Sequence, residues 1–114
     1  MNLPVNFSTP PGKEPHRFFR NLCIEFKKLL QSSKDLTKLE AVMGDFLNAS
    51  KEMNWHNKNT GVYHKAEGDK IVSKVWNEFK RYTLTLQSGT QADPEFVLTA
   101  IDDAISLINA MKVT

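Results

Sequence analysis

The sequence predicts an all-α fold, a four-helix bundle with antiparallel up-down-up-down topology and an extended, proline-rich N-terminal tail. Three observations support this prediction. Four stretches place apolar residues at the three- and four-residue steps of an amphipathic helix. Short polar segments rich in serine, asparagine, glycine or proline separate these stretches. The length of 114 residues fits one domain with a single hydrophobic core.

The tail is expected over residues 1–15, ahead of a single bundle domain over residues 16–114. Four of the five prolines fall in the first 15 residues, which argues against a helix there. Leu3, Val5 and Phe7 alternate with polar residues. We expect this segment to lie in a groove of its own domain, to dock on a partner, or to be a disordered terminus.

The first helix is expected from Arg17 to Gln31, where the apolar residues fill one arc of about 140° on a helical wheel. They are Phe18, Phe19, Leu22, Cys23, Phe26, Leu29 and Leu30. Ser32 and Ser33 then interrupt the pattern. We expect Ser32 to cap the second helix, with Asp35 completing a pair that resembles a capping box.

The second helix is expected to run to about Asn54. Its core face consists of Leu36, Leu39, Met43, Phe46, Leu47 and Met53. Gly44 lies outside this face and costs up to ~1 kcal/mol relative to alanine. The polar stretch from Asn54 to Gly61 then predicts a loop.

The third helix is expected from about Tyr63 to Leu86, and Ser88 and Gly89 end it. One arc gathers Ile71, Val72, Val75, Trp76, Phe79, Tyr82 and Leu86, and His64 and Gly68 extend this arc if the helix begins early. Residues 82–86 alternate in the manner of a strand. They also continue the helical face, so we assign them to the helix.

The fourth helix begins with the clearest signal in the chain. Asp93, Pro94 and Glu95 supply an N-cap acid, a first-turn proline and a carboxylate that suits the helix dipole. The apolar arc that follows, over residues 96–111, is about 200° wide. A face this wide must touch at least two neighbours, so we expect this helix to be central in the bundle or partly buried against a second copy.

The net charge of +2 is unevenly distributed. Residues 1–86 contain 14 basic and 9 acidic residues, whereas residues 87–114 contain 1 and 4. The positive excess favours an anionic partner on one side of the molecule. It is too small for a strongly cationic nucleic-acid-binding protein.

The single cysteine, Cys23, excludes an intramolecular disulfide and any zinc site built on several thiolates. We therefore expect a cytoplasmic protein. The prolines interrupt any signal-peptide pattern near the start of the sequence. No apolar run reaches the ~18 residues of a membrane-spanning helix, so we expect no transmembrane segment.

The sequence contains no catalytic signature, and we expect neither an enzyme nor a metal or cofactor site. The three histidines do not have metal-ligand spacing. Cys23 falls on the core arc of the first helix, where burial makes a thiol inert. Asp102 and Asp103 are adjacent, so they point to different sides of a helix and form no carboxylate dyad.

One segment resembles the histidine phosphotransfer domains, which are four-helix bundles of similar length. In these domains a lysine and a glycine follow the phosphorylated histidine by three and four residues. Here Gly68 matches the glycine after His64, but Glu67 stands in place of the lysine. The resemblance implies phosphotransfer through His64. A carboxylate at position 67 would instead repel a phosphoryl group.

Two basic stripes lie opposite the core arcs of the first and third helices. Their members are Arg17, Arg20, Lys27 and Lys28, with the apolar Ile24 among them, on the first helix, and Lys70, Lys74 and Arg81 on the third. Such stripes suit phosphates, an acidic protein or an anionic membrane surface. The alternative is an ordinary solvated face.

The loop between the second and third helices is the other candidate site. Trp55 and His56 lie among asparagines and a lysine, and Tyr63 follows. Trp55 either packs back over the end of the bundle or stays exposed as a recognition anchor, because tryptophan and tyrosine concentrate binding energy at interfaces.

These observations favour a small, non-enzymatic, intracellular protein-interaction module. We expect it to bind another protein, or itself as a homodimer, through the wide face of the fourth helix or the Ile24 and Trp55 surfaces. Nucleic-acid binding through the two basic stripes is the alternative function. Phosphotransfer through His64 is a remote one.

Overall fold

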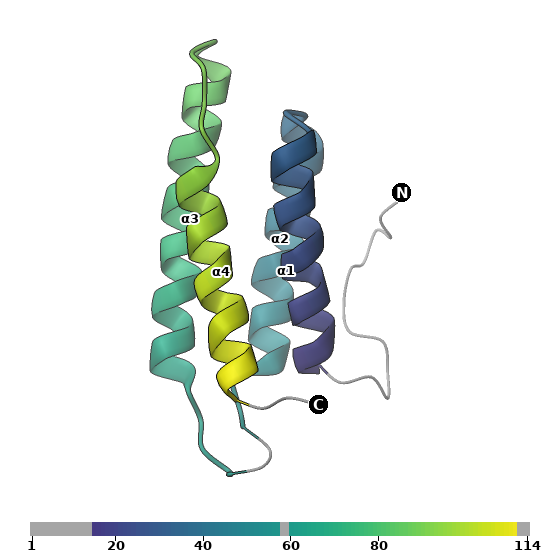
Figure 1. The fold of residues 1–114 in the computed structure, drawn as a ribbon, viewed down its shortest axis with the longest axis vertical. Helices are drawn as coiled ribbons and strands as arrows, with labels where there is room; N and C mark the ends of the chain where they lie inside the picture. The colour runs from purple at the N-terminus through teal and green to yellow at the C-terminus, as the bar shows by residue number, and fades with distance from the viewer. Residues whose placement is uncertain (1–14, 58–59, 112–114) are drawn as a thin grey trace.

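The computed structural model describes residues 15–57 and 60–111, and the predicted tail, apart from Pro15, lies outside them. Four α-helices account for most of this part of the chain (Figure 1). They are α1 (Pro15–Ser32), α2 (Leu36–Met53), α3 (Lys65–Gln87) and α4 (Glu95–Ala110). The predicted all-α class is confirmed.

The four helices form an antiparallel bundle. Figure 1 shows α1 and α3 running in one direction and α2 and α4 in the other. Each helix packs against the next one in the chain, and α1 also packs against α4. α1 and α3 are therefore diagonal neighbours, as are α2 and α4. The up-down-up-down topology predicted from the helix pattern is present.

A row of aromatic rings runs through the core. Trp55, Phe19, Phe46, Phe26 and Phe79 follow one another with ring centroids 5.0–5.9 Å apart, mostly in edge-to-face contacts. All five side chains are buried. Such pairs contribute about 0.5–1.5 kcal/mol each beyond the burial of their area. This row joins α1, α2 and α3 to the loop that follows α2.

Asp35 begins α2, and the predicted cap at Ser32 is wrong. The Asp35 carboxylate accepts hydrogen bonds from the backbone N–H groups of Thr37 and Lys38 at 3.0 and 3.3 Å. Ser32 instead ends α1, and its hydroxyl donates to the carbonyl oxygen of Lys28 at 2.8 Å. A carboxylate at this position also suits the positive end of the helix dipole.

The other helix boundaries differ from the predictions by one or two residues. α3 begins at Lys65 rather than Tyr63, because Val62 and His64 form backbone hydrogen bonds with Asn57 and Trp55. At the start of α4, Asp93 accepts a hydrogen bond from the N–H of Glu95 at 3.0 Å, and Pro94 occupies the cap position. Residues 82–86 are helical, as predicted.

The wide apolar face of α4 is largely covered within the chain. α4 packs against both α1 and α3, which bury Val97, Leu98, Ala100, Ile101, Ala104 and Ile108. Phe96, in contrast, is 69% exposed. Of the two expectations for this helix, burial between two neighbours accounts for the width of its face. The broad face is therefore not free to bind a second copy.

None of the helices within residues 15–57 and 60–111 combines the length and apolarity needed to cross a membrane.

Candidate functional site

The loop between α2 and α3 is anchored in the core by Trp55, which is only 1% exposed. Its indole meets Phe19 edge-on, with the ring centroids 5.4 Å apart. On α3, Gly68 leaves room for this ring, because a β-carbon at position 68 would overlap the indole. Trp55 thus packs back over the end of the bundle. Of the two alternatives that the sequence left open for Trp55, the exposed recognition anchor is the one that the structure excludes.

Backbone hydrogen bonds fix the shape of the loop. The N–H of His64 donates to the carbonyl oxygen of Trp55 at 2.7 Å, and the N–H of Asn57 donates to that of Val62 at 2.8 Å. The N–H of Gly61 donates to the carbonyl oxygen of Asn57 at 2.8 Å. Gly61 has a φ of +75°, a conformation that glycine adopts without strain. The two ends of the loop are therefore held together as in a short hairpin.

The outer side of this loop carries apolar side chains. Val62 is 50% exposed and Tyr63 is 59% exposed. The ring of Tyr63 stacks on the imidazole of His56, with centroids 4.4 Å apart and planes 25° from parallel. A single antiparallel β-bridge pairs the same two residues. The loop thus buries Trp55 and leaves Val62 and Tyr63 exposed.

His64 lies just before α3 and is partly buried. Its Nδ1 atom is 3.4 Å from a carboxylate oxygen of Glu67. In the phosphotransfer resemblance Glu67 replaces the lysine, and it lies directly beside the ring that would carry the phosphoryl group. The like charges of the two groups would repel each other. This geometry does not favour phosphotransfer.

The basic stripe on α1 is partly neutralised by its neighbours. Lys27 forms an ion pair with Asp102 of α4. The Nζ atom of Lys28 lies 3.6 Å from the carboxylate of Glu25. Arg20 donates through Nη1 to Asn109 Oδ1 at 3.5 Å. Exposed Arg17 and Ile24 complete this stripe.

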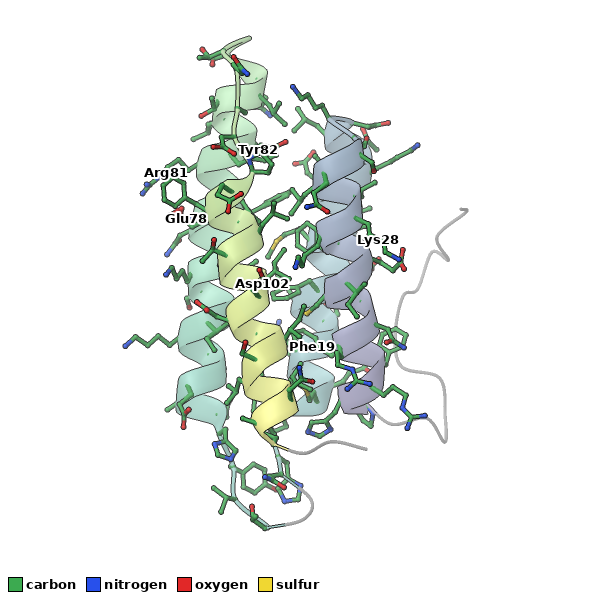
Figure 2. All side chains as sticks on the ribbon, in the orientation of Figure 1. Phe19, Lys28, Glu78, Arg81, Tyr82 and Asp102 are labelled. Carbon is green, nitrogen blue, oxygen red and sulfur yellow. The ribbon has the colours of Figure 1, made fainter. Side chains whose placement is uncertain are left out.

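The basic stripe on α3 lies on a different side of the molecule. Figure 2 shows Arg81 and Glu78 at one edge of the bundle and Lys28 at the other. Arg81 Nη1 lies 3.7 Å from the carboxylate of Glu78, while Lys70 and Lys74 are exposed. Because α1 and α3 are diagonal, the two stripes do not merge into one basic surface.

A groove between α2 and α3 was not predicted from the sequence. Its cavity of about 280 Å³ is lined by Glu40, Met43, Gly44, Leu47, Trp76, Phe79, Lys80 and Thr83. Trp76, which the helical wheel placed on the core arc, is 39% exposed at this groove. The ammonium group of Lys80 lies 5.3 Å from the centroid of the Trp76 ring.

The candidate reactive groups are separated in the fold. Cys23 is fully buried among apolar side chains, and this burial raises the pKa of its thiol. Asp102 and Asp103 are both exposed, and Asp102 is engaged by Lys27. Within the described part of the chain, no three His, Cys, Asp or Glu side chains come together as a metal-binding group.

No protein-family model, curated protein or solved structure matches this chain.

Proposed function

We propose that the chain is a non-enzymatic protein-interaction module whose recognition element is the loop between α2 and α3. The observation behind this proposal is that the loop combines buried anchors with exposed apolar side chains. Trp55 and Asn57 are buried, while Val62 and Tyr63 are exposed. The partner is another protein that offers an apolar pocket to these two side chains.

The hydrogen bonds of the loop support this assignment on energetic grounds. Ordering a loop on binding costs free energy, about 0.5–1.5 kcal/mol for each side chain that becomes immobilised. Here the backbone pairs Trp55 with His64 and Asn57 with Val62 before any partner arrives. Stacking on His56 also restricts the ring of Tyr63. Tyrosine provides a large contact area with few rotatable bonds, which is typical of binding hot spots.

We place this module in the cytoplasm. Its one cysteine is a free thiol, and free thiols persist in reducing compartments. Binding to a protein is also consistent with the basic stripes, since lysines paired with Asp102 and Glu25 release fewer counterions when a polyanion binds.

The test compares three forms of the full chain: wild type, the double variant Val62→Ser/Tyr63→Ala, and Phe96→Ala. Phe96 is the control because it is an exposed aromatic residue on a different element. Proteins retained from a native lysate by each form are quantified by mass spectrometry. Any protein that the loop variant retains less than the other two forms do is purified, and its Kd is measured for all three forms.

We expect the loop variant to raise this Kd by about tenfold or more, as truncation of a hot spot does. The Phe96→Ala variant should bind like the wild type. Far-ultraviolet circular dichroism and thermal unfolding confirm that the loop variant stays folded. Equal retention of every protein by all three forms would show that the loop is not a recognition element.

A further inference from the structure

The groove between α2 and α3 leaves apolar side chains uncovered in the middle of the bundle. Trp76 is 39% exposed, and Leu47, which packs against the core, is only partly buried. This is the seam at which two consecutive helices touch least.

Gly44 opens the wall of this groove to the backbone of α2. A glycine inside a helix costs about 0.5–1 kcal/mol relative to alanine. At Gly68 the missing β-carbon makes room for Trp55, but a β-carbon at Gly44 would meet no atom within 4 Å. Nothing in the described chain uses the space at Gly44. Another backbone can approach α2 closely at this point.

The two rims of the groove carry opposite charges. Glu40 on α2 and Lys80 on α3 are both exposed and both line the groove. Neither side chain forms an ion pair with any residue in ranges 15–57 and 60–111. A two-fold axis that runs along the groove, parallel to the helices, would place α2 of one copy against α3 of the other. Each Glu40 would then face the Lys80 of the second copy, so the surface is complementary to itself.

We propose that this groove is the site of self-association, and that its occupant is a second copy of the chain related by a two-fold axis. The second copy covers Trp76 and Leu47, approaches the α2 backbone at Gly44, and forms two Glu40–Lys80 pairs between the protomers. This surface is separate from Val62 and Tyr63, so a dimer keeps both recognition loops available.

The experiment measures the dimer dissociation constant of the full chain by sedimentation equilibrium from nanomolar to submillimolar concentration. The variants are Glu40→Lys, Lys80→Glu, the combination of both, and Trp76→Ala. Lys70→Glu is the matched control, because it makes the same charge change on the outer face of α3. Circular dichroism and thermal unfolding confirm that each variant is folded.

We expect each single charge reversal to raise the dissociation constant by about tenfold or more, since it creates two like-charge contacts per dimer. The combined variant should restore dimerisation, because the pairs form again with exchanged signs. Trp76→Ala should weaken the dimer and Lys70→Glu should leave it unchanged.

Several outcomes would overturn the proposal. One is a wild-type chain that stays monomeric at every concentration. Another is a dimer whose dissociation constant changes no more with Trp76→Ala and Lys80→Glu than with Lys70→Glu. A third is a combined variant whose dissociation constant does not return toward the wild-type value. A chain that dimerises only after residues 1–14 are removed would show that its own N-terminal segment, with Leu3, Val5 and Phe7, occupies the groove instead.

Discussion

The indole of Trp55 occupies the space in which a β-carbon of residue 68 would lie, so the glycine at that position is required by the tryptophan. This contact joins the loop to the first turns of α3. It also sets the position of the exposed side of the loop, because Trp55 and His64 are hydrogen-bonded through their backbones.

Substitution of Gly68 by alanine is expected to destabilise the fold. The methyl group would displace the indole, and forcing extra atoms into a packed site costs about 1–3 kcal/mol. The gain in helix propensity, at most about 1 kcal/mol, does not offset this cost. Urea unfolding of Gly68→Ala measures the difference in free energy of unfolding.

Gly44→Ala is the matched control for this prediction. It places the same methyl group in open space, so it should stabilise the monomer by up to about 1 kcal/mol. Combining Gly68→Ala with Trp55→Ala should cost less than the sum of the two single changes. Additive costs would show that the two residues do not share this space.

The start of α2 depends on Asp35 rather than Ser32. Asp35→Ala removes the acceptor for two backbone N–H groups and is expected to lower the free energy of unfolding by about 1 kcal/mol. Ser32→Ala loses only an exposed hydrogen bond to Lys28 and should stay within about 0.5 kcal/mol of the wild type. Chemical unfolding of the two variants compares these values, and the reverse order would assign the cap to Ser32.

Burial of Cys23 makes stability depend on pH in the alkaline range. The pKa of the thiol is raised in the folded state by desolvation. Above about pH 8.5, the ordinary pKa of cysteine, the unfolded chain loses a proton that the folded chain keeps. The unfolded state is then favoured, so stability falls as pH rises, with a slope of up to about 1.4 kcal/mol per pH unit.

The measurement compares urea unfolding of the wild type and Cys23→Ala between pH 7 and 10 under reducing conditions. The alanine variant loses packing at every pH, but it lacks the thiol contribution to the slope. The wild-type advantage should therefore shrink as pH rises. A constant difference between the two proteins would mean that Cys23 ionises as readily in the folded state as in the unfolded state.

The sequence predicted the helices well because their core faces repeat at helical spacing over several turns. It assigned the cap of α2 to Ser32 and not to Asp35, because both side chains can accept hydrogen bonds from N–H groups and the spacing of the pair resembles a capping box. The fate of Trp55 was left open for a different reason. The residues next to Trp55 in the sequence are polar. The space that its indole fills exists because Gly68 on α3 has no β-carbon.

The groove between α2 and α3 could not be predicted from the apolar pattern of one helix, because the pattern does not give the distance between helices. Trp76 falls at the edge of the apolar arc of α3, and its exposure depends on how closely α2 approaches. Likewise, the charge of Lys27 is offset by Asp102 only because α1 and α4 are neighbours in space. Properties set by the distance between helices follow from the fold and not from the period of one segment.

The order in which the helices pack also bears on how the chain folds. α1 with α2, and α3 with α4, are helical hairpins built from residues close in sequence, and such local contacts form fast. The α1–α4 seam instead closes a loop that spans most of the chain, which has a higher entropic cost. We therefore expect the two hairpins to form first and their docking, with Lys27 reaching Asp102, to limit the folding rate.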